Sequence, residues 1–309
     1  MSKFHISLKG KLEINHANEG KPMKRKKLGN SNFTISAIGL GCMPMSLSSR
    51  PPESQSIAVI HRALDLGVTL LDTADSYCQD ESDKHHNEHL IAKALQEYSG
   101  DIRAVTVATK GGLMRPQGAW TRNGNPHHLR KTIRESFEAL GGKEPIDLWQ
   151  YHSPDPGYTI EEALAPAKEA VEAGMIRFIG VSNFSVEQIK RARDTVEVVS
   201  VQNQYNPWHR QPESDGVLEY CETEKLTFFP WSPLGGSRRA ASLQDKSAIA
   251  KLAAEKNVSV YCIVLAWLMA QSPCVVPIPG ATKVSSIEDS LRALEVKLTD
   301  EELQQIAVS

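Results

Sequence analysis

Four polar residues that could act together in one reaction follow short apolar runs of this chain. Asp72 and Tyr77 lie in "GVTLLDTADSY", Lys110 ends "AVTVATK", and His152 follows "IDLWQY". Short apolar runs that end in polar residues are typical of buried β-strands. A carboxylate, a phenol, an ammonium and an imidazole at strand ends are the groups that a site for carbonyl reduction needs.

The four groups suit proton transfer to a carbonyl oxygen. A free phenol has a pKa of about 10 and is a weak acid at neutral pH. A nearby ammonium favours the phenolate, so we expect Lys110 to lower the pKa of Tyr77. Asp72 would keep that ammonium charged and in place, and His152 would orient the carbonyl oxygen. Each residue alone also has a structural explanation, such as helix capping by Asp72, but all four at strand ends favour a shared site.

The composition is that of an ordinary globular protein. The 309 residues are 40% hydrophobic and 23% charged, with a formal net charge of −2. This charge gives no electrostatic reason to bind nucleic acid or an anionic membrane, and no stretch approaches the roughly 20 apolar residues of a membrane span. Five cysteines without a CxxC pair indicate free thiols in a reducing compartment. We expect a cytoplasmic monomer, and an oxidant-sensitive thiol at Cys78 stays open.

Strand and helix patterns alternate along most of the chain. Strands are predicted over 37–41, 68–73, 104–110, 146–151, 176–182, 198–202, 226–231 and 275–280. Helices are predicted near 54–66, 86–98, 126–140, 160–173, 185–195, 213–224, 245–256, 259–271 and 284–293. Eight apolar strands, each followed by a helix, predict an α/β fold, a closed (β/α)₈ or TIM barrel.

A short segment precedes the first of these units. The stretch "KRKKLGNSNFTIS" reads as two strands around a Gly-Asn-Ser turn, which predicts a β-hairpin that closes the bottom of the barrel. An open doubly wound sheet is the alternative fold. It is disfavoured because "GLGCMP" has Pro44 where the third glycine of a dinucleotide-binding turn belongs. We expect an N-terminal extension over 1–23 and a single domain over 24–309.

The sequence resembles the aldo-keto reductase family over about residues 24–300. The matching motifs are "GVTLLDTADSY" with "NEHLIAKAL", "VATKGG", "YHSPDP", "AGMIRFIGVSNFS", "VQNQYNP", "PWSPLGG" and "VPIPGATKVSSIEDSL". The resemblance implies NAD(P)H-dependent reduction of aldehydes or ketones without a metal. It implies that Tyr77 is the general acid, that Lys110 paired with Asp72 lowers its pKa, and that His152 orients the carbonyl.

The resemblance also implies which residues hold the dinucleotide. Amide and hydroxyl groups would grip the nicotinamide carboxamide, Trp231 would stack on its ring, and the loop after Trp231 and the "GATK" segment would hold the phosphates. The implied residues are Gly41, Asp72, Ser182, Asn183, Gln202, Trp231, Ser232, Leu234, Gly235, Gly280, Thr282, Lys283 and Asp289. Lys283 is the one nearby cation for a 2′-phosphate, which favours NADPH while NADH stays open.

The chain departs from the family in two places. Ser286, Asp289 and Ser290 stand where members often have Arg, Glu and Asn, so the phosphate clamp is weaker. The chain also ends soon after "KLTDEELQQIAVS", where many members have a longer tail over the substrate. We expect an open pocket whose walls include Met43, Trp120 and Trp208, with Arg238 as a further candidate.

A metal site and a regulatory role are the alternatives to this function. His85, His86 and His89 lie close together, as zinc ligands can on a helix, but the HExxH order is absent and we expect no metal site. The alternative from another class is a cofactor-binding redox sensor or regulatory subunit with slow reductase activity. Slow turnover and retention by a membrane-protein partner would distinguish it from an enzyme. The sequence gives neither the substrate nor the oligomeric state.

Overall fold

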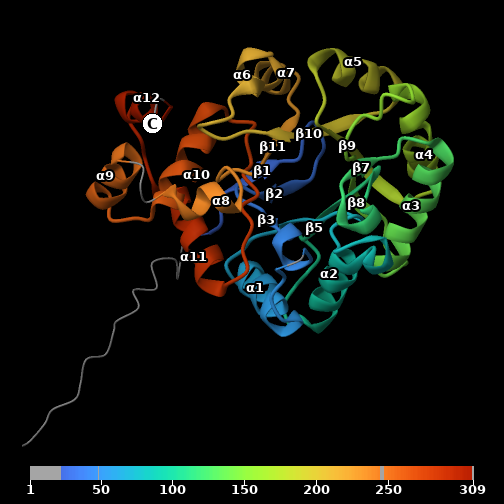
Figure 1. The fold of residues 1–309 in the computed structure, drawn as a ribbon, viewed down its shortest axis with the longest axis horizontal. Helices are drawn as coiled ribbons and strands as arrows, with labels where there is room; N and C mark the ends of the chain where they lie inside the picture. Colours follow the sequence, from blue (N-terminus) through green and yellow to red (C-terminus); the bar gives the residue numbers. More distant parts are fainter. Residues whose placement is uncertain (1–21, 48, 244–246, 308–309) are drawn as a thin grey trace, which may run out of the picture.

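Seven parallel strands curl into the wall of a barrel in a computed structural model, which describes residues 22–47, 49–243 and 247–307 (Figure 1). Their order is β11-β10-β9-β8-β5-β4-β3. The strands are β3 (Leu40–Gly41), β4 (Leu70–Asp72), β5 (Thr106–Gly111), β8 (Ile146–Tyr151), β9 (Ile176–Ser182), β10 (Val198–Gln204) and β11 (Thr227–Trp231). All seven lie at predicted strand positions.

The segment 275–280, which was predicted as the eighth strand, joins the two edges of this sheet. Val276 N donates to Phe228 O on β11 at 2.9 Å. On the other side, Gly41 N on β3 donates to Pro279 O at 3.0 Å. The segment is not a continuous strand, because Pro277 and Pro279 have no N–H to give to a ladder. The paired contacts on both sides nevertheless close the barrel, which confirms the predicted fold.

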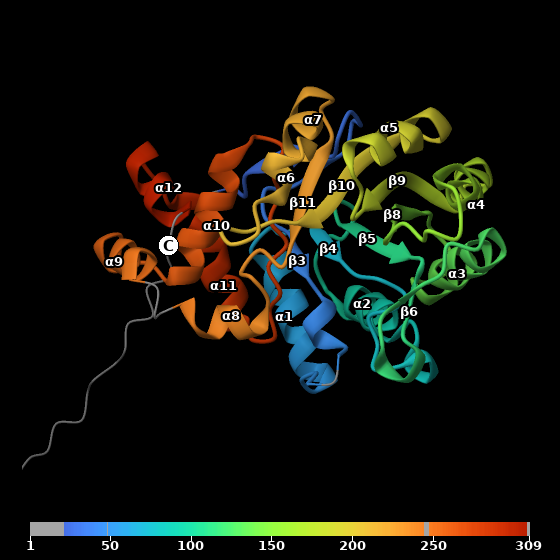
Figure 2. The ribbon, with the colours of Figure 1, turned by 45° about the horizontal axis from the view of Figure 1, so that its top comes forward.

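Helices cover the outside of the barrel on all sides (Figures 1 and 2). Those that follow the successive strands are α1 (Glu53–Asp65), α2 (His86–Glu97), α3 (Pro126–Ala139), α4 (Ile160–Glu172), α5 (Val186–Thr195), α7 (Val217–Thr223), α10 (Val260–Gln271) and α11 (Val284–Arg292). Side-chain caps mark where α3, α4, α5 and α10 begin. In α4, for example, Thr159 Oγ1 accepts from Glu162 N while Glu162 accepts from Thr159 N, which forms a reciprocal capping box.

Some elements differ from the sequence-based expectation. The helix predicted near 213–224 is two short helices, α6 (Gln211–Ser214) and α7, because Gly216 between them has a φ of 78° that ends a helix. The helix predicted near 245–256 is α9 (Ser247–Glu255). The unexpected elements are α8 (Ser237–Ala241), α12 (Asp300–Ala307), the hairpin of β6 (Leu113–Met114) and β7 (Thr121–Arg122), and the 3₁₀ turns Met43–Met45, Glu81–Asp83, Pro116–Gly118 and Ala293–Glu295.

In the part of the chain that the structure describes, no single helix combines the length and the apolar composition of a membrane span. Ala248–Glu255 and Val260–Gln271 reach both only as a pair, and that pair is bent by 98°.

A two-stranded hairpin closes the N-terminal end of the barrel, as predicted. It consists of β1 (Arg25–Lys27) and β2 (Thr34–Ser36), which are antiparallel. Gly29 N donates to Thr227 Oγ1 at 2.8 Å, and Ser36 N donates to Thr69 Oγ1 at 2.9 Å. Both threonines lie where strands begin, so the hairpin occupies the end opposite the strand C-termini. The predicted extension over 1–23 falls mainly outside the described residues.

Two groups of apolar side chains form the core. The first lies inside the barrel and comprises Leu28, Ile35, Leu70, Ala108, Leu148, Val199, Phe229, Val276 and Ile278. The second lies between the barrel wall and the helices and includes the fully buried Trp149 and Trp267. The hairpin and the first group fill the N-terminal end of the barrel. The polar side chains that the sequence predicts for the site therefore lie at the end with the strand C-termini.

Candidate active site

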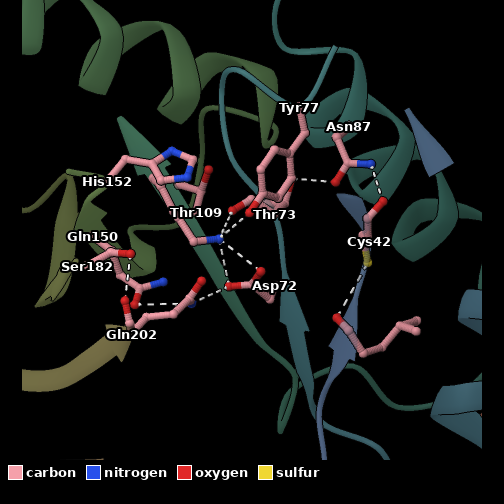
Figure 3. A network of polar contacts seen from close by, with 12 residues as sticks. Cys42, Asp72, Thr73, Tyr77, Asn87, Thr109, Gln150, His152, Ser182 and Gln202 are labelled. Carbon is pink, nitrogen blue, oxygen red and sulfur yellow. Dashed lines mark hydrogen bonds and ion pairs between the residues drawn. The ribbon is translucent and has the colours of Figure 1, made fainter. Parts of the chain in front are cut away.

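Lys110 is the centre of a buried polar network at the C-terminal end of the barrel, and Figure 3 shows its neighbours Asp72, Thr73 and Tyr77. Its Nζ donates to both carboxylate oxygens of Asp72 at 2.8 and 2.9 Å, and to Thr73 O at 2.8 Å. It also lies 3.1 Å from Tyr77 Oη. The neighbouring strands β4 and β5 carry the carboxylate and the ammonium, so their parallel pairing brings these groups together.

His152 lies across the same space from Tyr77. It directly follows β8, and its ring centre is 5.8 Å from that of Tyr77 at an interplanar angle of 77°. The imidazole is buried, and its Nδ1 has no hydrogen-bond partner among the described residues. The structure therefore brings all four candidate residues together at one end of the barrel.

Burial dominates the acidity of these groups. Burial raises the pKa of Tyr77 to about 12, although the ammonium of Lys110 lowers it in part. Lys110 thus lowers the pKa of the phenol as expected, but the net pKa is raised, because removal from water disfavours the phenolate more than one ammonium favours it.

Lys110 and His152 differ in charge, since the first is ionised and the second is neutral. Burial lowers the pKa of Lys110, but Asp72 and Tyr77 raise it by more, so the ammonium stays charged. Burial and the nearby ammonium hold the pKa of His152 well below its usual value, so the imidazole is neutral at neutral pH.

Amide and hydroxyl groups line one side of this network. Gln202 Nε2 donates to Asp72 Oδ1 at 2.9 Å, and Ser182 Oγ donates to Gln202 O at 2.7 Å. Asn183 Nδ2 donates to His152 O at 3.0 Å, and Asn183 Oδ1 accepts from Trp231 Nε1 at 3.0 Å. These residues lie at or near the C-terminal ends of the neighbouring strands β9, β10 and β11, so their closeness follows from the sheet order.

This set of donors and acceptors fits a nicotinamide. A carboxamide needs both a donor and an acceptor, which the amides of Asn183 and Gln202 and the hydroxyl of Ser182 provide. The half-buried indole of Trp231 adds an aromatic face beside them. Gln202 Oε1 has no hydrogen bond to any described residue and can accept one from a ligand.

The loop after β11 is a tight turn. Ser232 has a φ of 48° and Gly235 a φ of 77°, and Gly235 N donates to Ser232 O at 2.9 Å. Asn206 Nδ2 donates to the same carbonyl at 3.0 Å, which fixes the turn. Leu234, which the resemblance also implies for this loop, is half-buried.

The remaining cofactor candidates lie around the seam where the barrel closes. A Cβ on Gly41 would lie 2.7 Å from Ile278 O, and one on Gly280 would lie 2.8 Å from Pro44 Cγ. Both glycines therefore permit close packing of the seam.

Beyond the seam, Lys283 is exposed, and its ammonium forms no hydrogen bond or ion pair with a described residue. Thr282 O accepts from Gln55 Nε2 at 2.6 Å, and Asp289 Oδ2 accepts from Ser259 Oγ at 2.5 Å. The carboxylate of Asp289 thus binds the N-cap residue of α10.

The predicted wall residues are spread over three loops. Trp120 is 46% exposed, and its ring centre is 6.5 Å from that of Tyr77. The guanidinium of Arg115, a buried residue that the sequence analysis missed, lies 4.0 Å from the Trp120 ring centre. Met43 lies in the 3₁₀ turn after β3, and Trp208 contacts Arg239 of α8. The side chain of Arg238 lies outside the described residues.

A second buried cluster lies between β4 and α2, next to the network. Burial raises the pKa of Asp75 to about 7, and its nearest cation, Lys84 Nζ, is 3.4 Å away. His85 Nδ1 lies 2.6 Å from Glu88 Oε2. Among the residues described, no group of three or more His, Cys, Asp or Glu could hold a metal ion.

Comparisons with known proteins agree with this geometry. The sequence model named Aldo/keto reductase family matches residues 37–308. An uncharacterized oxidoreductase of Schizosaccharomyces pombe is 34% identical over 275 residues, which are 87% of this chain and 85% of that protein.

Solved structures extend the likeness to the fold. The thermostable aldo-keto reductase Tm1743, solved with the inhibitor epalrestat, is similar with a TM-score of 0.77 and 30% identity over 93% of this chain and 99% of that one. The glycerol dehydrogenase AKR11B4 from Gluconobacter oxydans is similar with a TM-score of 0.79 and 26% identity, covering 91% and 93%. The holo form of the aldo-keto reductase AKR11C1 from Bacillus halodurans has a TM-score of 0.74 and 25% identity, covering 92% and 95%.

Proposed function

This chain belongs to the aldo/keto reductase family, and we propose that it reduces an aldehyde or ketone to an alcohol with NAD(P)H. The observation that supports this most is the buried chain of Asp72, Lys110 and Tyr77 beside His152. The cofactor, when bound, supplies a hydride to the carbonyl carbon. The residues of this chain supply the proton, the orientation and the charge balance.

Tyr77 is the proposed proton donor. Its phenol is fully protonated at neutral pH because its pKa is about 12. When its proton passes to the carbonyl oxygen, the remaining phenolate lies 3.1 Å from the ammonium of Lys110. In a buried site that attraction is strong, and the fixed ammonium needs no rearrangement to provide it. Asp72 keeps the ammonium charged and aimed at the phenol.

His152 is the proposed orienting group. A neutral imidazole has one N–H donor and one acceptor nitrogen, so it can donate to a carbonyl oxygen without competing for the proton of Tyr77. The ammonium nearby helps to keep the imidazole neutral. The two rings then bind the same oxygen from two sides.

The proposed cofactor is NADPH, with NADH as the alternative. Ser182, Asn183 and Gln202 would hold the carboxamide, and Trp231 would stack on the ring. Ser232, Leu234 and Gly235 would contact the pyrophosphate, and Lys283 would bind the 2′-phosphate. Gly41, Gly280, Thr282 and Asp289 would shape the groove around them. We propose Met43, Trp120 and Trp208 as walls for a small carbonyl substrate.

We also propose a monomeric cytoplasmic enzyme with one domain over 24–309 and an extension over 1–23. The five cysteines are unpaired, and four of them are buried, which suits a reducing compartment. Cys78 is among the buried four, and burial raises the pKa of its thiol to about 12, which gives no support for a reactive thiolate there.

Substitution of the proton donor tests the function. In Tyr77→Phe, we expect turnover of an aldehyde panel to fall by roughly 10²–10⁴-fold, the usual contribution of a general acid. The dissociation constant for NADPH, measured by tryptophan fluorescence, should stay within about two-fold. The control is Tyr98→Phe, which removes a surface phenol bonded to Asp65 on α1. Wild-type turnover in Tyr77→Phe would refute the mechanism, and cofactor binding without any turnover by the wild type would favour the sensor.

Substitution of Lys283 tests the cofactor preference. Its single exposed charge would contribute up to about 1 kcal/mol to binding of a 2′-phosphate. In Lys283→Ala, we expect the dissociation constant for NADPH to rise by up to about five-fold and that for NADH to stay unchanged. Lys297→Ala, another exposed lysine beyond α11, is the control. Equal changes for both cofactors would exclude Lys283 as the residue that selects NADPH.

A further inference from the structure

Gln150 is a fully buried polar residue on β8, between the apolar side chains of Trp149 and Tyr151. It lies on β8, opposite Lys110 on β5, and two residues before His152, so it shares their face of the sheet. Its Nε2 has no hydrogen-bond partner among the described residues. A buried amide with an unpaired N–H group needs an explanation, because such groups are rare in folded proteins.

The explanation begins at Asp72, which accepts hydrogen bonds and donates none when it is ionised. Because of this, Gln202 must turn its NH₂ group rather than its oxygen toward the carboxylate, and Nε2 lies 2.9 Å from Asp72 Oδ1. The same Nε2 lies 3.5 Å from Gln150 Oε1, a longer and weaker contact (Figure 3). Both N–H groups of Gln202 are thus directed into the barrel, and only its Oε1 is left for a ligand.

The orientation of Gln150 follows from that of Gln202. If the amide of Gln150 were turned over, two NH₂ groups would face each other with no acceptor between them. Its Oε1 must therefore face Gln202, and its Nε2 is left without a partner. The unpaired N–H is the result of a chain of orientations that begins at the carboxylate of the catalytic network.

We propose that Gln150 is a positioning residue for cofactor binding, which accepts the second N–H of Gln202 and so keeps Gln202 Oε1 available for the carboxamide NH₂ of nicotinamide. The inference rests on the proposed function. Without Gln150, Gln202 has a single anchor at Asp72, and its amide plane turns about that one hydrogen bond. The carboxamide then meets a mixture of donor and acceptor orientations.

Two substitutions at Gln150 separate positioning from packing. Gln150→Met keeps the volume and removes the acceptor, whereas Gln150→Glu keeps an acceptor oxygen in either protonation state. We expect the dissociation constant for NADPH to rise about five-fold or more in Gln150→Met, the size of one hydrogen bond, and to stay within about two-fold in Gln150→Glu. A packing role predicts the reverse, because a core tolerates Met and resists a buried carboxyl group.

Ser200→Ala is the matched control. Ser200 is fully buried on β10, two residues before Gln202, and its Oγ also has no partner among the described residues. Its substitution removes a buried polar group near Gln150 and breaks no side-chain hydrogen bond to a described residue. We expect it to leave the dissociation constant for NADPH unchanged.

A double variant checks the route through Gln202. If Gln150 acts only on Gln202, then Gln150→Met has no effect on NADPH binding in a Gln202→Leu background. The same fold-change in both backgrounds would overturn the proposal, as would unchanged binding in Gln150→Met alone. Failure of the wild type to bind either NADPH or NADH would overturn the proposed function and this inference together, so the two failures are distinguishable.

Discussion

At the scale of single residues, burial decides how the ionisable side chains around Tyr77 behave. Burial raises the pKa of the Tyr77 phenol, and Lys110 keeps its charge because Asp72 is bound to it. Asp75 is also buried, but its carboxylate has a single ion-pair partner among the described residues, Lys84 at 3.4 Å, and accepts no hydrogen bond from them. Burial of that carboxyl group therefore opposes ionisation at a position two residues from the proton donor.

The raised pKa of Asp75 makes stability depend on pH. Between its ordinary value of 3.8 and about 7, the folded protein keeps a proton that the unfolded chain has lost. The free energy of unfolding should therefore fall as pH rises through this window, by up to roughly 1.4 kcal/mol for each pH unit, and level off above it. Lys84 and His85 lower the pKa of this carboxyl group and so narrow the window, whereas the carboxylate of Glu88 raises the pKa and widens the window.

Asp75→Asn removes this titration. Urea unfolding at several pH values should show that the wild type loses stability relative to Asp75→Asn between about pH 4 and 7. Parallel curves for the two proteins would show that Asp75 ionises in the folded state as it does in water.

At the scale of elements, apolar runs and their order predicted the strands, the surrounding helices and the meeting of the four catalytic candidates. Of the elements that escaped prediction, α8 and the hairpin of β6 and β7 are too short to show an apolar period, whereas α12 has Leu303, Ile306 and Ala307 at helical spacing and could have been predicted. The strands β6 and β7 have two residues each, and their pairing depends on the loop that carries Trp120. Gln150 could have been found, because it is the one polar residue between Leu148 and His152 on the same strand face. The net pKa of Tyr77 could not have been predicted from the sequence, because it depends on how deeply the phenol is buried.

The hairpin of β1 and β2 gives a test at this scale. Leu28 is fully buried among the side chains inside the barrel, so Leu28→Ala should lower the free energy of unfolding by about 2–5 kcal/mol. Because the hairpin closes the end opposite the polar network, NADPH binding should be unchanged at a temperature where the variant is folded. Arg25→Ala, an exposed change on β1, is the control. A large loss of NADPH affinity in folded Leu28→Ala would contradict this separation.

At the scale of the whole molecule, closure of the barrel joins residues far apart in the sequence. The seam between β3 and residues 275–280 has few backbone hydrogen bonds because of its prolines, and Gly41 and Gly280 allow its backbone to pack closely. Gly280 lies in the seam and Thr282 lies just beyond it, and both are proposed cofactor residues. Stability and the proposed cofactor binding would therefore depend on the same stretch of backbone.

Gly41→Ala tests the seam. The added methyl group would lie 2.7 Å from a backbone oxygen, Ile278 O, which cannot move without opening the barrel. Overpacking of this kind should lower the free energy of unfolding by about 1–3 kcal/mol, measured in urea. If Gly41 serves the cofactor alone, the variant will keep wild-type stability and lose only NADPH affinity.

The position of the hairpin also determines by which face this protein can be attached to a surface. Met23 lies against Gly67, before β4 begins, so the described chain enters the fold at the face that the hairpin covers. A tether on the residues before Met23 would hold the protein by that face. Attached in this way to an electrode or a bead, the molecule would point the open end of its barrel at the solution.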